Sequence, residues 1–251
     1  MSDRDLVEPT GEYRAHSTDQ IDTSQLLRRV SHELLTPLTT VRLALQLGLG
    51  RIQRGDRLEP ASLQRALSQV DEIVRLISQL REAAHLMSDE PAPTGQVIEL
   101  GEMLRRQVDQ FVASRPKHSW QLLRSDKPVQ VRADRGSLEQ VLVQLLDNAC
   151  KFSSAGSEVL VTLSSSDGQA SISIADQGIG IPANIQRRVF ELFFRAPNAV
   201  ESSARGLGIG LFIARELLSK CAGRLWVESK VGGGSTFHVV LPVYSPPDEG
   251  S

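Results

Sequence analysis

The stretch SHELLTPLTT, residues 31–40, places a histidine and a proline inside what otherwise reads as a long amphipathic helix. Apolar residues recur around it at steps of three and four, the period of one buried helix face: Leu27, Val30, Leu34, Leu38, Val41 and Leu45. At about 100° per residue from Val30, His32 falls at about 200° and Thr36 at about 240°, well off this stripe. We therefore predict a helix from about residue 21, with His32 and Thr36 one turn apart on its exposed face.

Pro37 has no N–H to donate to the carbonyl of Glu33, and its ring crowds that carbonyl. We expect the helix to bend just after His32, because a proline inside a helix costs about 3 kcal/mol. Two interpretations of the histidine remain open at this point. An exposed histidine beside a tolerated proline is an ordinary surface feature, but an exposed imidazole is also a candidate reactive group.

A second helix is expected after the break GRIQRGDRLEP, residues 50–60, with Pro60 in its first turn. Its apolar stripe consists of Leu63, Leu67, Val70, Val74, Ile77 and Ala84. The short connection predicts an antiparallel all-α hairpin over residues 21–90. Two helices alone cannot cover both stripes, so we expect a second copy to complete a four-helix homodimer through this region.

Composition narrows the class of protein. The 251 residues contain 28 basic and 30 acidic side chains, which gives no electrostatic footprint of a nucleic-acid binder. Cys150 and Cys221 are far apart in helical patterns, as expected in a reducing compartment. No apolar run approaches the roughly 18 residues of a membrane span, and residues 1–20 are polar, without the features of a signal peptide. We expect a cytoplasmic chain with no membrane span and with a disordered tail at 1–20.

A second domain is expected after SDEPAPTG, residues 88–95, whose prolines and glycine are typical of a linker. The apolar pattern then alternates between helical and strand periods up to about residue 243, followed by a short tail at 244–251. We predict helices near 99–114, 135–152, 184–193 and 208–220, and strands near 118–124, 128–132, 157–164, 170–175, 223–229 and 234–241. This order predicts a two-layer α+β sandwich over residues 96–243.

Three short motifs in this domain contain residues suited to a nucleotide. LLDNACKF (145–152) puts Asn148 and Lys151 on one helix face, and DQGIGIP (176–182) puts Asp176 at a strand end before two glycines. RGLGIGL (205–211) places three glycines before a helix, whose N-terminus is suited to phosphate oxygens. Each motif alone is weak, because glycine-rich runs are more often simple turns.

Taken together, the order and spacing of these motifs resemble those of two-component sensor histidine kinases. VSHELLTPLTT (30–40) is similar to the phosphoacceptor box, and the ATP-binding motifs follow in the family's order: the N box at 144–152, the G1 box at 176–182, the F box FELFFR at 190–195, the G2 box at 206–211, and the terminal GGGSTFHVVLP at 232–242. The resemblance covers about residues 21–242. It implies a phosphoacceptor hairpin followed by a GHKL-type ATP-binding domain, and the activity of a protein-histidine kinase.

The resemblance also implies roles for the residues of the hairpin and the N box. His32 would attack the γ-phosphate of ATP, and Glu33 beside it would manage the other proton of the imidazole ring. Asn148 would hold Mg²⁺ through its side-chain oxygen, and Lys151 would meet phosphate charge.

In the remaining boxes, Asp176 would contact the adenine amino group, and Gly178 and Gly180 would leave room for the base. The triphosphate would be lined by Gly206, Gly208, Gly210 and Leu211. Arg195 would either pair with phosphate or brace a mobile lid at residues 196–204.

Further partners follow from the same resemblance. A cognate response regulator would accept the phosphoryl group on an aspartate, and the stimulus would come from a region outside this chain or from a separate signalling protein. Family members with threonine at the offset of Thr36 often also dephosphorylate their regulator. The alternative for Thr36 is purely structural, because a threonine can bond back to the preceding helical turn.

Two positions depart from the family pattern. Leu35 stands where members commonly have arginine, and Gln144 stands where many have asparagine. The same motifs also occur in two alternative classes of protein. A GHKL-type ATPase of the gyrase or chaperone kind needs a glutamate at position 144 to activate water, which glutamine cannot do. A non-catalytic dimeric scaffold that binds nucleotide is disfavoured by the intact glycines and Asn148.

Overall fold

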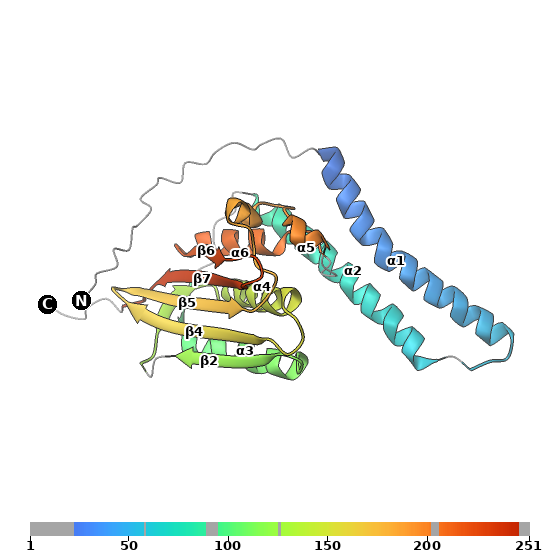
Figure 1. Cartoon of the computed structure of the whole chain (residues 1–251), viewed down its shortest axis with the longest axis horizontal. Helices are drawn as coiled ribbons and strands as arrows, with labels where there is room; N and C mark the ends of the chain where they lie inside the picture. Colours follow the sequence, from blue (N-terminus) through green and yellow to red (C-terminus); the bar gives the residue numbers. More distant parts are fainter. Residues whose placement is uncertain (1–22, 58, 89–94, 125–126, 202–205, 246–251) are drawn as a thin grey trace.

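The computed structural model describes residues 23–57, 59–88, 95–124, 127–201 and 206–245. It consists of a long helical hairpin that leads into an α+β domain (Figure 1). The predicted tail at 1–20, most of the predicted linker, the end of the predicted lid and residues 246–251 lie outside the described residues.

The hairpin is formed by α1 (Thr23–Gln53) and α2 (Pro60–Leu86), which pack against each other. Pro60 occupies the first turn of α2, as predicted, where a missing N–H costs no hydrogen bond. Arg51 and Glu59 form an ion pair of 2.8 Å across the connection. Helix α1 continues through Pro37, whose ring is buried, and the bend predicted after His32 stays a prediction.

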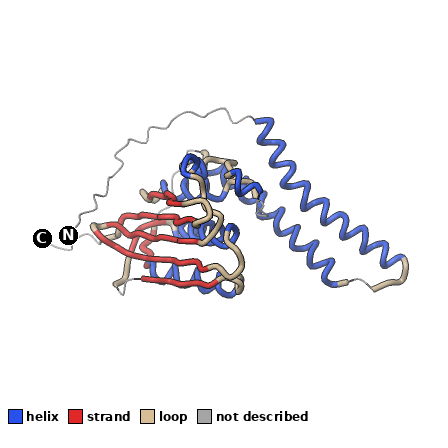
Figure 2. The backbone as a smooth tube through the Cα atoms, in the orientation of Figure 1, coloured by secondary structure: helices blue, strands red, loops and turns tan. Residues whose placement is uncertain are grey.

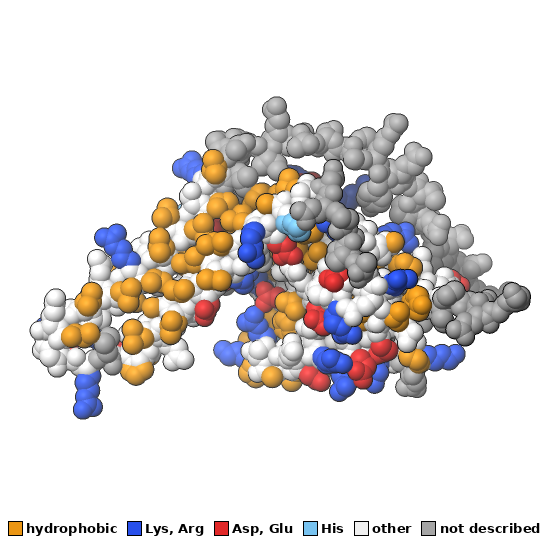
Figure 3. Space-filling model, turned by 180° about the vertical axis from the view of Figure 1, so that it is seen from behind, with side chains coloured by type: hydrophobic (Ala, Val, Ile, Leu, Met, Phe, Trp, Pro, Cys, Tyr) orange, Lys and Arg blue, Asp and Glu red, His pale blue; other side chains and the backbone are white. Residues whose placement is uncertain are grey.

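Both predicted stripes of the hairpin are largely exposed within one chain. Figure 3 shows apolar side chains gathered along both helices. The exposed members of the two stripes are Leu27, Leu38, Leu45, Leu63, Leu67, Val70, Val74 and Ile77. Only Val30 and Leu34 of the α1 stripe pack against the core of the chain. The hairpin therefore presents a long apolar surface that nothing in the described chain covers.

The α+β domain contains a five-stranded sheet in the order β2 (Ser119–Arg124), β4 (Glu158–Ser166), β5 (Gln169–Asp176), β7 (Ser235–Pro242) and β6 (Arg224–Ser229). The β2–β4 pair is parallel and the other pairs are antiparallel. Helices α3 (Leu100–Ser114), α4 (Arg135–Phe152) and α6 (Gly210–Ser219) cover one face (Figure 2). Alternate residues of β5 and β7 are buried beneath these helices, so the predicted two-layer architecture is confirmed.

Capping side chains position the helices of this layer. The Asp134 carboxylate accepts a hydrogen bond of 2.8 Å from the backbone N–H of Ser137 and so begins α4. Glu99 does the same for α3 by accepting from Gly101 and Glu102. From its cap, α4 buries Leu138, Leu142 and Leu145 against the sheet and leaves a second face for a pocket.

Three elements differ from the sequence prediction. The helix predicted at 184–193 is instead two short 3₁₀ turns, Ala183–Ile185 and Arg188–Phe190. Between them the Gln186 side chain donates to the carbonyl oxygens of Ile181 and Ser229, so contacts with the preceding loop and with β6 override the helical pattern. Strand β1 (Gln96–Glu99), which pairs with β3 (Gln130–Ala133), has only four residues and no clear pattern. The short helix α5 (Pro197–Glu201) lies within the predicted lid.

The second half of α2 docks on the α+β domain. Leu76, Ala83 and Leu86 are buried in the same apolar core as α4 and α6, and α2 packs directly on α6. Glu82 accepts a hydrogen bond from Gln140 of α4 at the edge of this contact. The hairpin and the α+β domain therefore share one continuous core in this arrangement.

Candidate functional site

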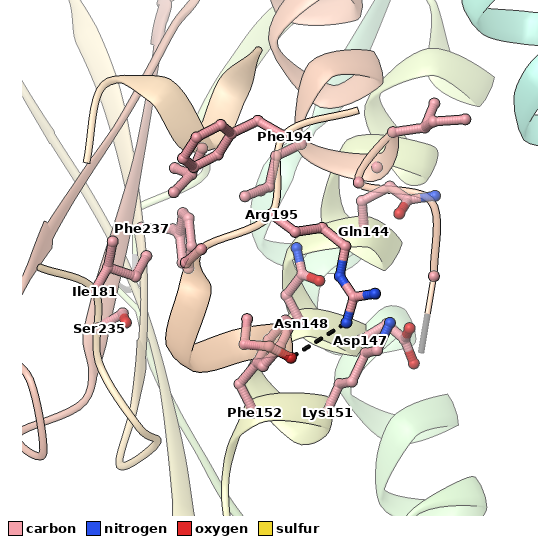
Figure 4. A pocket seen from close by; sticks show the side chains of 18 of the residues that line it. Gln144, Asp147, Asn148, Lys151, Phe152, Ile181, Phe194, Arg195, Ser235 and Phe237 are labelled. Carbon is pink, nitrogen blue, oxygen red and sulfur yellow. Dashed lines mark hydrogen bonds between the residues drawn. The ribbon is translucent and has the colours of Figure 1, made fainter. Parts of the chain in front are cut away.

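A pocket opens between α4, the loop after β5 and the segment that precedes α6 (Figure 4). The sequence motifs at 144–152, 176–182 and 206–211 all contribute to its wall. The predicted site residues that line it are Asn148, Lys151, Asp176, Gly180, Arg195, Gly206, Gly208, Gly210 and Leu211. Folding therefore brings together residues that are up to 63 positions apart in the sequence, from Asn148 to Leu211.

Asp176 is buried at the inner side of the pocket. Its Oδ1 accepts hydrogen bonds from the backbone N–H of Gly178, at 2.8 Å, and of Ser235, at 3.2 Å. Burial raises the pKa of this carboxyl to about 6, although the two backbone hydrogen bonds oppose the rise. Because Oδ1 is occupied, Oδ2 is the oxygen left to accept a hydrogen bond from a ligand.

Glycine is required in the two loops because other parts of the backbone approach these positions closely and because one of them has a positive φ. Gly178 lies against Asp176, and a Cβ there would sit 2.6 Å from the carbonyl oxygen of Phe152. Gly208 has φ +73°, and a Cβ there would collide with the carbonyl oxygen of Phe194. These positions accept only glycine if the loops are to keep their shape.

Helix α4 supplies the polar floor of the pocket. Figure 4 shows Asn148, Asp147 and Lys151 of this helix pointing into the same region as Arg195. Burial lowers the pKa of the Lys151 ammonium, while the charge of Asp147 opposes this change. Gln144, one turn before Asn148, also lines the pocket, and its side chain lies where a Cβ on Gly210 would be.

Arg195 connects three parts of the molecule. It lines the pocket, donates from Nη2 to the carbonyl oxygen of Ala199 in α5 at 3.2 Å, and places Nη1 3.7 Å from Oε1 of Glu33 in α1. The Arg195 and Glu33 side chains are each only 18% exposed. Both alternatives for Arg195 therefore stay open, because it braces the lid and also reaches the pocket.

The first part of the predicted lid is better anchored than expected. Ala196 and Ala199 are buried, and Asn198 donates a hydrogen bond of 2.8 Å to the carbonyl oxygen of Gly180. The prediction of a mobile lid over 196–204 is therefore wrong for the residues that form α5, which are held by these contacts. The small alanine side chains gave no signal of burial.

The three predicted residues of α1 lie outside the pocket wall. His32 is exposed, as the helical wheel predicted, and its neighbour Glu33 makes the contact with Arg195. Thr36 donates from Oγ1 to the carbonyl oxygen of His32 at 2.9 Å. This bond is the back-bonding that the structural alternative for Thr36 expects.

Sequence reasoning missed several residues of the pocket. Arg75 and Gln79 come from α2, and no local pattern distinguishes them from ordinary exposed helix residues. Phe152 and Phe237 line the pocket from α4 and β7, and the alternation of β7 could have identified only Phe237 as inward-facing.

The donor set fits a magnesium ion that is shared with phosphates. Among the described residues, no group of three or more histidine, cysteine or acidic side chains could hold a metal alone. Mg²⁺ in nucleotide sites usually takes one or two protein oxygens and completes its shell with phosphates and water. The side-chain oxygen of Asn148, with that of Gln144 one turn away, provides such a partial set.

Family models match both halves of the chain. Residues 22–89 match the His Kinase A (phospho-acceptor) domain, and residues 133–245 match the histidine kinase-, DNA gyrase B- and HSP90-like ATPase family.

Among the helices of the described residues, none combines the length and the apolar character that a membrane crossing needs.

Similar proteins extend this result over most of the chain. The adaptive-response sensory kinase SasA of Prochlorococcus marinus is 34% identical over 232 residues, which is 90% of this chain and 60% of that protein. The chain thus spans about 60% of the length of these curated relatives.

Two solved structures are similar in both sequence and fold. The structure of full-length ShkA in complex with AMPPNP has a TM-score of 0.65 at 26% identity and matches 89% of this chain and 46% of that one. The mycobacterial sensor histidine kinase MprB has a TM-score of 0.53 at 31% identity, over 61% of this chain and 99% of that one. Because the chain is 31% identical to MprB over 99% of that solved chain, and its two parts match the phospho-acceptor and ATPase family models, it belongs to the sensor histidine kinase family.

Proposed function

We propose that this chain binds ATP in the described pocket and transfers its γ-phosphoryl group to His32. The observation that supports this most directly is the ion pair between Arg195, which lines the pocket, and Glu33, which adjoins His32. This contact supports the proposal because the segment that carries His32 and the wall of the pocket lie against each other with no further element between them. The complex of ShkA with AMPPNP supports ATP as the nucleotide.

In the proposed step, a nitrogen of the His32 imidazole attacks the γ-phosphorus, and the bond from that phosphorus to the β–γ bridging oxygen breaks. ADP leaves with the electron pair of this bond. The other ring nitrogen carries a proton that must be held or removed as phosphohistidine forms, and the Glu33 carboxylate is the adjacent acceptor. For Glu33 to act in this way, its contact with Arg195 must loosen.

The pocket residues bind and orient the nucleotide. Asp176 Oδ2 accepts from the adenine amino group, and the glycines at 206, 208 and 210 let the backbone approach the phosphates. Lys151 and Arg195 contribute positive charge, which stabilises the transferred group. Asn148 would hold Mg²⁺, which neutralises phosphate charge during transfer when it is bound.

Two partners belong to the proposal. The exposed apolar stripes of the hairpin would pair with those of a second copy, as the match to the His Kinase A domain also indicates. Phosphohistidine would then pass its phosphoryl group to an aspartate of a response regulator in the cytoplasm.

A water-activating ATPase is not favoured, because the pocket presents the Gln144 amide where such an enzyme needs a carboxylate.

The test is labelling with γ-labelled ATP and Mg²⁺. We expect alkali-stable, acid-labile label on the wild-type chain and none on His32→Gln, because His32 is exposed and its loss removes no core contact. Asn148→Ala should lose the Mg²⁺-dependent labelling but keep its fold. Label on His32→Gln at the wild-type level would refute the assignment of the phosphoacceptor.

A further inference from the structure

The nucleotide pocket includes two residues from outside its own domain. Arg75 and Gln79, one turn apart on α2, line the pocket with the residues of α4. They reach it because Leu76 and Ala83 of the same helix are buried against the α+β domain. The docked hairpin therefore forms one wall of the site, in addition to carrying His32 on α1.

The Arg75 guanidinium is held in place by its own helix. Nε donates to Oε2 of Glu72 at 2.8 Å, and Nη2 donates to Oε1 at 2.5 Å. This bidentate contact fixes the plane of the side chain and leaves both hydrogens of Nη1 for another acceptor. Because the side chain is 43% exposed, a ligand can reach it without rearrangement of the core.

Arg75 belongs to a cluster of cations at one end of the pocket. The positive charges of Arg75 and Arg195 both act on Lys151, whose pKa is lowered mainly by burial. The carboxylates nearby also have partners of their own, since Asp147 pairs with Arg115 at 2.7 Å, Glu72 with Arg75 and Glu33 with Arg195 at 3.7 Å. The charges of Asp147 and Glu72 still offset part of the positive charge at Lys151. Such a cluster favours an additional anion with several oxygens.

Asp176 lies away from this cluster. Ser235, whose backbone N–H donates to Asp176, lies on the opposite side of the pocket from Lys151 and Arg195 (Figure 4). The pocket therefore has one end suited to a neutral base and another suited to polyphosphate, and Arg75 lies at the second.

We propose that Arg75 of α2 binds the triphosphate of ATP and makes the docked hairpin a part of the nucleotide site. This inference rests on the proposed function, because it assumes ATP as the nucleotide. Arg75 would then contribute to ligand specificity by binding the charged phosphates, whereas Asp176 recognises the base. It also requires that bound ATP favours the docked arrangement of α2, because the contact exists only there.

The experiment compares two ligands on the full chain by calorimetric titration: a non-hydrolysable ATP analogue with Mg²⁺, and adenosine. The variants are Arg75→Ala, Arg75→Lys and, as the matched control, Arg81→Ala, which removes an exposed arginine of the same helix outside the pocket. Alanine favours helix, so α2 should form in every variant.

We expect Arg75→Ala to weaken binding of the ATP analogue by roughly five- to ten-fold and to leave adenosine binding unchanged. Arg75→Lys should lie between Arg75→Ala and wild type, because it keeps the charge and loses the planar fork. Arg81→Ala should match wild type.

If the wild-type chain binds the ATP analogue and Arg75→Ala binds it equally tightly, the inference is overturned and the proposed function stays intact. An equal loss of affinity for analogue and adenosine would also overturn it, because Arg75 would then shape the pocket as a whole. Failure of the wild-type chain to bind either ligand would refute the proposed function and this inference together.

Discussion

The guanidinium of Arg195 lies 3.7 Å from the carboxylate of Glu33, so the F box of the ATP-binding domain touches the residue that follows His32. While this pair is closed, the Glu33 carboxylate is directed at Arg195 rather than at the histidine ring. A polyphosphate near Arg195 offers that guanidinium a competing anion. We infer that binding of ATP and release of Glu33 are coupled through this one side chain.

Glu33→Gln tests this arrangement. Glutamine keeps the size of the side chain and a carbonyl oxygen for Arg195, but it cannot take a proton. We expect autophosphorylation of His32 to fall by about 100-fold, as for the loss of a positioned base, with unchanged affinity for a non-hydrolysable ATP analogue. The control is Glu59→Gln, which removes the surface charge that pairs with Arg51. Equal labelling rates for Glu33→Gln and wild type would show that the carboxylate takes no part.

Asp176→Asn should weaken ATP binding by at least about ten-fold. The backbone N–H groups of Gly178 and Ser235 both point at Oδ1, so the amide oxygen must take that position. The amide NH₂ then faces the adenine amino group, and two donors oppose each other. Titration with adenosine measures this directly, because no phosphate contact can compensate. Wild-type affinity of the variant for adenosine would exclude Asp176 from base recognition.

The same residue predicts a dependence on pH. Its pKa of about 6 in the folded chain lies above the ordinary 3.8, so between these values the folded protein holds a proton that the unfolded chain releases. The contribution of Asp176 to stability is therefore largest at low pH and declines as pH rises toward 6. ATP affinity should change in the opposite sense and fall as pH drops below about 6, because protonated Asp176 is a poor acceptor. Parallel melting and binding curves of wild type and Asp176→Asn isolate both effects.

Thr36→Ala separates the two interpretations of that residue. Thr36 donates to the carbonyl of His32, which supports a structural role, but the same hydroxyl lies one turn from the His32 side chain. We propose that it also orients water toward the phosphorylated regulator. The variant should keep autophosphorylation and transfer, and should slow the loss of phosphate from the regulator by roughly ten-fold. Equal lifetimes of the regulator phosphate with both proteins would leave Thr36 as a structural residue.

Charge placed on the exposed hairpin stripe should break the proposed dimer. Leu67 and Val74 are 63% and 58% exposed in the single chain, so Leu67→Asp with Val74→Asp costs little in a monomer. In a four-helix dimer the same carboxylates would be buried without partners and would strongly disfavour association. Sedimentation should show a monomer for this variant. Val231→Asp, equally exposed on the α+β domain, is the control and should behave as wild type. A monomeric wild-type chain would refute the dimer.

The parts of the fold that could be predicted from the sequence depend on residues that are close together along the chain. The α4 span from Arg135 to Phe152 was predicted at both ends, because Asp134 is a strong cap and the leucine spacing is regular. The contacts of Arg75 and Arg195 could not be predicted, since each depends on how α2 docks against another domain. Strand β1 and helix α5 are held by pairing and by buried alanines, which leave little periodic signal.

Helix α2 would contact two different partners on two opposite sides. Its exposed stripe, at Leu63, Leu67 and Val74, lies about half a turn around the helix from the docked side, at Leu76 and Ala83. Both sides belong to one helix of 27 residues, so a rotation of α2 changes the position of both. If a second copy binds on one side of α2 and nucleotide binds on the other, the two binding equilibria influence each other equally. The factor by which self-association changes ATP affinity is the factor by which ATP changes self-association.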